Sequence, residues 1–514
     1  MEEKQKKNIM NFRLFLYVAI ALITSTVLSV YVFVGEKSKL VFLIIIAALI
    51  FMCLILSLIF KKKFLIFILI LLTGFIIPIS SVYSKSILLN QNLSKNVENC
   101  YFSGKIYTRK TDLDKKVIKL YLSDVEINST ENISGDIFVY INTENLDVSK
   151  LEVGTTVLVN GSIELYSLQD ENLSKAVSKI SSGVVGDCFI RAYNIKVVES
   201  KISSARDKFK ELVCDKSQKV KFGDIGYAML FGDTTVLDPD IKGVFQESGT
   251  AHLLAVSGFH VSLVVLMLSF VMKKLKVNRY ARVGIIAAVL GFYIYLCNFS
   301  VSVIRASIMA VLSLYAVART KEYDGLSALS IAASLLLIIS PLELFNISFV
   351  LSFVSVLSII LVMPVLNRLL SNVFYDKLAG TLALNFAVQL GLFVTQVCYF
   401  GKVPVLSFFT NLITVPLASF AFMFFICALI LTLILPFAAP VMNLFGIIMQ
   451  LLVRFNNFVS GIAITIDVGI LSGFAVLLSL VMMFVVSDYV FVKKRTKTVL
   501  SLITLAFIVS LMII

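Results

Sequence analysis

Long, uninterrupted apolar runs constrain the fold of this chain more than any other feature. The first three are Leu14–Val34, Leu40–Phe60 and Phe64–Val82. Each holds about 20 residues, enough for a helix to cross a bilayer core of about 30 Å. The first run is too long, and too closely followed by the second, to be a cleaved signal peptide. Only 15% of the 514 residues are charged, against about 25% in a soluble domain. The runs predict a polytopic all-α membrane protein with about 11–13 transmembrane helices.

Hydropathy divides the chain into residues 1–84, with N-terminal transmembrane helices, a polar segment 85–222, and a second transmembrane part, 223–514. The basic loops Lys61–Lys63 and Lys273–Arg282 should lie in the cytoplasm, because positively charged loops stay on that side. Three crossings then place residues 85–222 outside. These loops also explain the net charge of +14 without a nucleic acid partner.

The polar segment has the composition of short β-strands. The runs richest in β-branched and aromatic residues are 117–127, 137–141, 157–165 and 189–198, with turn residues between them. Gly161, inside a strand pattern, indicates a bulge or bend of the kind that barrel closure requires. We therefore expect an inserted extracytoplasmic small β-barrel (OB-like) domain. Its basic residues could line a DNA-binding groove or lie on a solvated hairpin; they are Lys105, Arg109, Lys110, Lys115 and Lys116.

Polar residues interrupt the apolar pattern between residues 228 and 265. Asp238 followed by Pro239 is typical of a helix N-terminus, and the short amphipathic helix should end at Ser248-Gly249. A second helix is expected to start near Thr250 and to enter the membrane. Its first half would hold polar and small residues that must face water or protein, namely His252, Ser257, Gly258 and His260.

This segment carries a resemblance to a known family. Gly249-Thr-Ala-His-Leu-Leu-Ala-Val-Ser-Gly-Phe-His-Val261, with Leu-Phe-Gly-Asp before it at 230–233, resembles the signature of ComEC-type competence channels, which import single-stranded DNA. Three further matches follow in family order. They are Val303-Ile-Arg-Ala-Ser-Ile-Met-Ala310, Asn346-Ile-Ser-Phe-Val-Leu-Ser-Phe353, and Gln389-Leu-Gly to Tyr399-Phe-Gly401 with Asn411-Leu-Ile-Thr-Val-Pro416.

The resemblance implies a function and a setting. A protein of this kind would pass single-stranded DNA through the cytoplasmic membrane of a bacterium during natural transformation, with 223–514 as its channel domain. We expect a non-enzyme without a cofactor or metal, which works with a DNA receptor outside and a DNA translocase inside. The sequence leaves open whether copies of the chain form a homo-oligomer. The metallo-β-lactamase-like domain found in many family members is expected to be missing, since the chain ends in an apolar helix. The expected channel or DNA contacts are Asp233, His252, Ser257, Gly258, His260, Arg305, Gln389 and Asn411.

Arg305 is the most informative of these residues. An unpaired arginine inside an apolar run costs about 3 kcal/mol or more, so it should face a water-filled path, a protein partner or a phosphate. A structural pair with a carbonyl or with Glu343 is the alternative. Intramembrane amides such as Asn385 and Gln389 can line a pore or join helices.

Two other function classes remain open. A solute or ion transporter would explain the spans and buried polar residues, but not the ordered motifs. An intramembrane hydrolase has slight support from Ser257 beside two histidines, although no Gly-x-Ser-x-Gly elbow is present. Two histidines in the whole chain exclude a multi-histidine metal site. Cys100 and Cys188 bracket the strand-rich segment on the oxidising side, so they either form a disulfide or remain free thiols.

Overall fold

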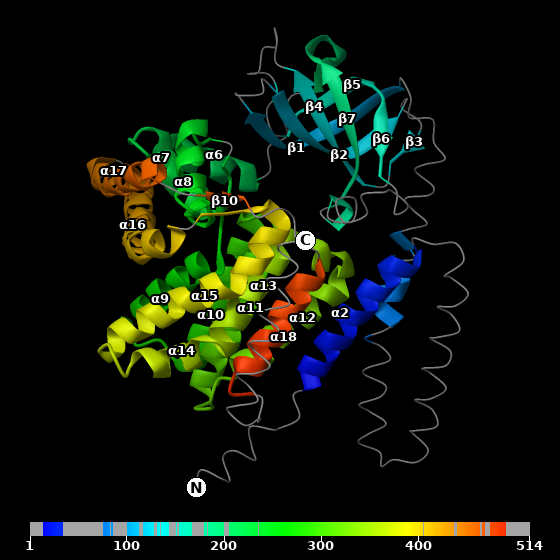
Figure 1. Cartoon of the computed structure of the whole chain (residues 1–514). Coiled ribbons are helices and arrows are strands. Elements are labelled where there is room, and N and C mark those ends of the chain that lie inside the picture. Colours follow the sequence, from blue (N-terminus) through cyan, green and yellow to red (C-terminus); the bar gives the residue numbers. More distant parts are fainter. Residues whose placement is uncertain are drawn as a thin grey trace, which may run out of the picture. The chain divides into compact units, whose positions relative to one another are not determined.

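The computed structural model of the chain describes its strands and most of its helices (Figure 1). The described residues are 14–33, 74, 76–82, 84–85, 100–112, 117–127, 131–133, 135–142, 151, 154–166, 179–181, 183–199, 205–234, 236–404, 406–435, 439–462, 465–467 and 473–489. The predicted spans Leu40–Phe60 and most of Phe64–Val82 lie outside these residues, as does the tail after residue 489.

The chain forms two compact units. The first comprises Met1–Ser203 with Ser330–Asn346, and the second comprises Ser204–Leu329 with Ile347–Ile514. Helix α12 (Gly325–Ile339) runs from the second unit into the first. The first unit holds α2 (Leu14–Phe33), which confirms the first predicted apolar helix, and a β-sheet.

The sheet of the first unit has the strand order β6-β7-β4-β2-β1-β5-β8, with β3 paired to β2. Strands β1, β2 and β4 form an antiparallel meander, and β4 pairs with β7 in parallel. Strand β1 also pairs with β5, and β6 pairs with β7. The strands are β1 (Cys100–Asp112), β2 (Val117–Ile127), β3 (Glu131–Asn132), β4 (Asp136–Asn142), β5 (Thr156–Gly161), β6 (Ile163–Leu165), β7 (Val184–Arg191) and β8 (Ile195–Glu199).

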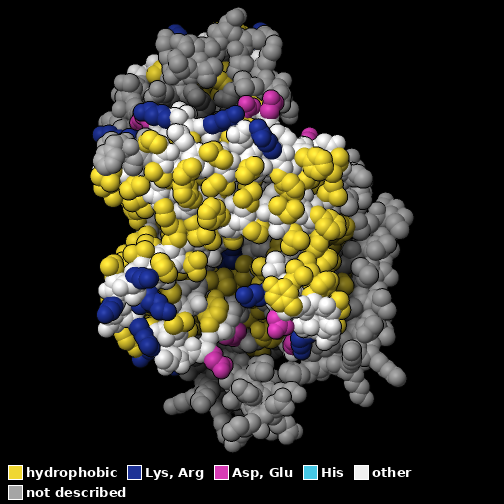
Figure 2. All heavy atoms as spheres, turned by 90° about the vertical axis from the view of Figure 1, so that its left-hand side faces the viewer, with side chains coloured by type: hydrophobic (Ala, Val, Ile, Leu, Met, Phe, Trp, Pro, Cys, Tyr) yellow, Lys and Arg dark blue, Asp and Glu magenta, His cyan; other side chains and the backbone are white. Residues whose placement is uncertain are grey.

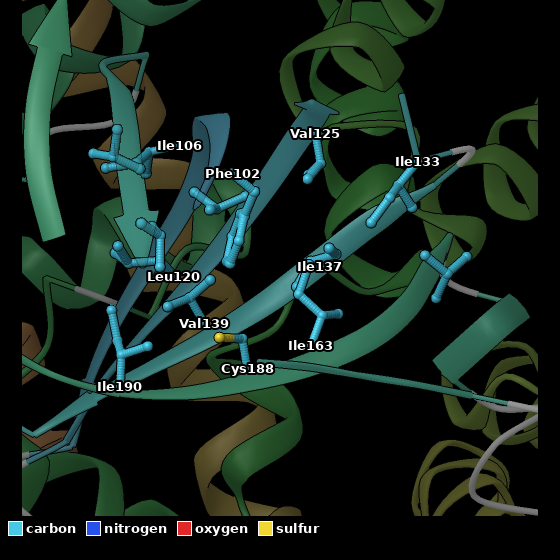
Figure 3. Close-up of a cluster of buried hydrophobic side chains, with 14 of the residues drawn as sticks. Phe102, Ile106, Leu120, Val125, Ile133, Ile137, Val139, Ile163, Cys188 and Ile190 are labelled. Carbon is cyan, nitrogen blue, oxygen red and sulfur yellow. The ribbon is translucent and has the colours of Figure 1, made fainter. Parts of the chain in front are cut away.

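One face of this sheet encloses the core of the unit. Buried and half-buried residues alternate along β2 and β4, as expected when successive side chains point to opposite faces of a strand. Figure 3 shows the side chains of Phe102, Leu120, Val139, Cys188 and their neighbours gathered on the same side of the strands. Phe102, Leu120 and Val139 are each 0% exposed.

The predicted strands are mostly confirmed. Residues 117–127 form β2, 137–141 lie in β4, and 157–165 form β5 and β6 with a break at Ser162. The single strand expected at 189–198 is wrong, because the 3₁₀ turn Ala192–Asn194 separates β7 from β8. Strand β1 was not predicted at all. The basic residues Lys105, Arg109 and Lys110 belong to it, in the hairpin that β1 forms with β2.

The second unit is mostly helical, with one antiparallel pair of short strands, β9 (Lys402–Pro404) and β10 (Thr465–Asp467). Five helices in the described part of the chain are long and apolar enough to cross a membrane, or six if the bent pair α13–α14 forms one span. Its helices are α6 (Ala205–Gln218), α7 (Gly223–Phe231), α8 (Pro239–Glu247), α9 (Gly258–Lys274), α10 (Arg279–Leu296), α11 (Val301–Ala318), α13 (Ile347–Leu361), α14 (Met363–Leu370), α15 (Asp376–Phe400), α16 (Ser407–Ile434), α17 (Ala439–Ile462) and α18 (Gly473–Val486).

The predicted start of α8 is confirmed, and the predicted start of α9 is corrected. Asp238 caps α8 by accepting a hydrogen bond from the N–H of Asp240. The second helix does not start near Thr250. Residues Ala251–Leu253 form a separate 3₁₀ turn, and α9 starts only at Gly258.

Hydrophobic side chains cover much of one face of the molecule, and Lys and Arg side chains gather toward its margins (Figure 2). Among the large apolar residues exposed on the long helices are Phe409, Phe420 and Ile434 of α16 and Phe458 of α17. Soluble monomers rarely expose apolar patches of more than a few hundred Å². A surface of this kind is suited to contact with lipid.

Candidate functional site

Helix α9 begins at Gly258 because Ser257 caps it. Ser257 has an extended backbone and forms a capping box with His260. Its N–H donates to Nδ1 of His260 at 3.3 Å, so Nδ1 is the acceptor in this contact. A capping box satisfies two backbone donors at a helix start. Ser257 and His260 therefore fix where α9 enters the helical core.

His260 is fully buried. It is 0% exposed, and its ring centroid lies 4.6 Å from that of Phe422 on α16. Its Nε2 has no hydrogen-bond partner within the described residues. This placement favours a role in positioning α9 over direct contact with a passing strand.

His252 does not share a helix with His260. It lies in the 3₁₀ turn η3 (Ala251–Leu253), and its side chain is exposed. The expectation that both histidines lie in the first half of one helix is wrong, because the capping box at Ser257 interrupts the apolar run between them.

Arg305 is buried in the second turn of α11 and has no carboxylate partner among the described residues. It is 5% exposed, and its Nε donates to Oγ of Ser352 on α13 at 2.7 Å. Nη1 lies 3.8 Å from Sδ of Met309, and the guanidinium lies 5.9 Å from the ring centre of Phe353. In the described part of the chain Arg305 makes no ion pair. Glu343, the predicted alternative partner, accepts a hydrogen bond from Asn346.

Gly258 permits the close approach of α9 to this arginine. A Cβ atom at Gly258 would lie 2.5 Å from Nη2 of Arg305 and 3.3 Å from Cβ of Ala306. No ordinary side chain fits at such a distance without a shift. Three helices that are distant in sequence, α9, α11 and α13, therefore meet through Gly258, Arg305 and Ser352.

The other predicted site residues do not join this cluster. Asp233 follows α7, beyond the left-handed Gly232 that ends the helix. Gln389 lies half-buried on α15, and Asn411 lies on α16 with Oδ1 buried and without a partner among the described residues. None of these three residues hydrogen-bonds to Arg305.

Two amides tie neighbouring segments together. Nδ2 of Asn385 donates to the carbonyl of Phe408 at 2.8 Å, which ties α15 to α16. Asn456 of α17 is fully buried and lies 3.4 Å from the hydroxyl of Thr250. Asn456 was not singled out in the sequence. Nor was Ser352, although it belongs to the motif 346–353, whose polar residues were the available signal.

The cluster offers hydrogen-bond donors for an anion beside aromatic rings. Arg305 supplies a fixed positive charge, and Phe353 stacks on Phe349 with ring centroids 4.2 Å apart. The Ser257–His260 contact has the form of a helix cap, and no third group orients Nε2 within the described residues, as a nucleophile–base pair would need. No group of three metal-ligating side chains occurs among the described residues.

Comparison with known proteins places these residues in a family context. The family model described as "Competence protein" matches residues 229–513, more than half of the chain, and includes every residue of the cluster. No solved structure matches the chain significantly.

Three curated proteins have similar sequences. An uncharacterized protein of Aquifex aeolicus is 31% identical over 49% of this chain and 58% of its own length. ComE operon protein 3 of Bacillus subtilis is 27% identical over 38% of this chain and 24% of its own length. Recombination protein 2 of Haemophilus influenzae is 26% identical over 43% of this chain and 30% of its own length. The chain thus matches less than two thirds of each relative.

Proposed function

We propose that the chain, which belongs to the competence protein family, passes single-stranded DNA through the cytoplasmic membrane of a bacterium during natural transformation. Family membership supports the role in competence. The more specific proposal, transport of a single DNA strand, is supported by the cluster around Arg305.

The observation that carries the proposal is the meeting of Gly258, Arg305 and Ser352. Arg305 is held by a neutral hydroxyl and has no carboxylate partner in the described part of the chain. A structural arginine inside a membrane pairs with a carboxylate or a backbone carbonyl, because an unpaired charge there costs about 3 kcal/mol or more. Among the described residues Arg305 hydrogen-bonds to neither kind of group. A passing anion supplies the missing charge.

Single-stranded DNA suits such a cluster in two ways. Its phosphates accept charge-assisted hydrogen bonds from a guanidinium, whose planar fork matches their geometry. Its bases stack on aromatic rings without sequence preference, and Phe353 and Phe349 provide such rings beside Arg305.

Uptake and membrane abundance, measured for the same variants in competent cells, test the proposal. Arg305→Leu should abolish uptake of labelled DNA and leave the membrane level of the protein unchanged. Arg305→Lys keeps the charge and loses the fork, so partial uptake is expected. The matched control is Arg319→Gln at the exposed end of the same helix, which should transport normally. Uptake that falls only in proportion to protein level would assign Arg305 a structural role.

We also propose the sidedness that the basic loops predict. Residues 85–222 would lie outside and the loop 273–282 inside. Reporter fusions at Asn145 and Lys276 test this directly, and cytoplasmic reporter activity at Asn145 would overturn it.

For the sheet we propose closure as an OB-type barrel. The meander β1-β2-β4, the parallel pair β4–β7 and the antiparallel pairs β1–β5 and β6–β7 support it. Only Ser162 separates β5 from β6, so one bent segment pairs with β1 at one end and with β7 at the other. An OB-fold is a five-stranded, partly open Greek-key barrel.

The proposed transport requires partners. No Walker motif is present in the sequence, and the driving force would come from a separate DNA translocase inside the cell. A separate receptor would deliver the DNA outside, and copies of the chain would associate within the lipid.

A further inference from the structure

The sheet of the first unit carries a row of aromatic rings on the face opposite its core. Consecutive ring centroids lie 5.4, 5.3, 6.4 and 4.8 Å apart. The row crosses strands β1, β2, β4 and β7, and its members in order are Tyr107, Tyr121, Phe138, Tyr140 and Phe189.

Strand alternation places these rings on one face. Leu120, Val139 and Cys188 point into the core, so the residues next to them point away from it. Tyr121 pairs directly with Phe138, and Tyr140 pairs with Phe189. Cross-strand aromatic pairs stabilise a sheet. Sheet stability alone does not require Phe189 to remain 62% exposed.

Positive charge is interleaved with the rings. Nζ of Lys119 lies 3.5 Å from the ring centre of Phe138 and 4.9 Å from that of Tyr140. Asp187, on the same face of β7, is neutralised by Lys179 at 2.6 Å. An ammonium group among aromatic faces offers a phosphate contact beside surfaces on which bases can stack.

We propose that this aromatic row, Tyr107 to Phe189, binds the bases of single-stranded DNA, with Lys119 contacting the backbone. The identity of the ligand rests on the proposed function. The position of the row supports it under the proposed OB-type closure of the sheet. Lys119, Tyr121, Phe138 and Tyr140 lie on β2 and β4, the second and third strands of the meander, and the face of strands 2 and 3 is the one that OB-folds use for oligonucleotides.

The test compares ligands with and without bases. The full-length protein in lipid nanodiscs is titrated with a fluorescent oligothymidine, with an abasic strand of the same length, and with duplex DNA. We expect the wild-type protein to bind oligothymidine much more tightly than either of the others. Equal affinity for the abasic strand would overturn base stacking, because only phosphates would then be recognised.

Variants locate the binding on the row. Phe138→Ala and Tyr140→Ala should each weaken oligothymidine binding about 10-fold and leave the abasic strand unaffected. Phe138→Leu preserves an apolar side chain and should also weaken binding, so the test survives if the alanine variant does not fold. The matched control is Tyr193→Ala, an aromatic residue that is 72% exposed on the turn between β7 and β8, and it should bind as the wild type does.

A charge variant separates the phosphate contact from stacking. Lys119→Gln should reduce the slope of log affinity against log salt by about 0.7, the change expected for one lost phosphate contact on a single strand. Crosslinks from 5-iododeoxyuridine should map to β4. Crosslinks that map only elsewhere, or unchanged binding in Phe138→Leu and Tyr140→Ala, would overturn the proposal.

Measuring DNA binding and DNA uptake separately distinguishes failure of the aromatic row from failure of the proposed transport. Base-dependent binding with no uptake by the wild-type protein would refute transport and support the aromatic row. If Phe138→Leu and Tyr140→Ala instead change the oligomeric state and leave DNA binding intact, the row is an interface between copies and the proposal is wrong.

Discussion

Replacing Gly258 with alanine would place a methyl group against the guanidinium of Arg305. The added Cβ would lie 2.5 Å from Nη2, whereas ordinary contact begins at 3.4 Å. Arg305 must therefore move by about 1 Å, the difference between these distances. Its Nε donates to Oγ of Ser352 at 2.7 Å, and we expect the shift to break this hydrogen bond.

Two effects oppose each other in this variant. Alanine favours a helix over glycine by about 1 kcal/mol. Losing a hydrogen bond made by a charged group costs about 1.5–3 kcal/mol. The loss is the larger effect. The difference is about 0.5–2 kcal/mol. It falls on the group proposed to contact DNA, so we expect Gly258→Ala to lower uptake by about 2- to 30-fold, since about 1.4 kcal/mol corresponds to a factor of ten.

The assay is uptake of labelled DNA normalised to membrane abundance. Gly284→Ala is the matched control, because Gly284 lies within α10 and nothing lies within 4 Å of its added Cβ. It should transport normally. Placing Gly258→Ala in an Arg305→Gln background should add little further loss, since the shorter side chain leaves room for the methyl group. Normal uptake by Gly258→Ala would show that the contact between α9 and Arg305 has no role in transport.

Three further expectations follow from other residues. Burial raises the pKa of the Cys188 thiol to about 12, so alkylation at pH 8 should occur only after unfolding; a disulfide with Cys100 would instead leave both unlabelled until reduction. Burial also raises the pKa of Asp136 above its ordinary 3.8, which destabilises the fold as pH rises past that value. Asp136→Asn can still accept the Tyr121 hydrogen bond and should raise the melting temperature near pH 7 but not near pH 3. Finally, the purified protein should not cleave DNA with Mg²⁺ or Mn²⁺, and chelator-sensitive cleavage by independent preparations would reveal a metal site outside the described residues.

The strands were largely predictable because their alternation is local. Residues 117–127 and 137–141 show it clearly. Strand β1 was missed because Gly104 occupies an inward position between Phe102 and Ile106, and Lys and Thr follow. The cysteines of the predicted pair, Cys100 and Cys188, are both buried, and no disulfide joins them in the structure. Their pairing stays a prediction.

The start of α9 and the contacts of Arg305 were harder to predict from the sequence. The run Ala251–Val256 is apolar and suggests a continuous helix, yet the Ser257–His260 cap determines the true start. Arg305 was recognisable as a buried charge in an apolar run. Its contacts with Gly258 and Ser352 depend on which helices cross, and a single sequence does not specify those crossings.

Photo-crosslinking of DNA in transit tests the central claim most directly. Phe353, beside Arg305, is replaced by photo-reactive benzoylphenylalanine in competent cells, and labelled DNA with a blocked trailing end is stalled during uptake. The same replacement at Phe270, which is 63% exposed on α9, serves as the control. The proposed path requires strong DNA crosslinks at position 353 and none at position 270. Uptake that proceeds normally without any crosslink at position 353 would contradict transport past Arg305.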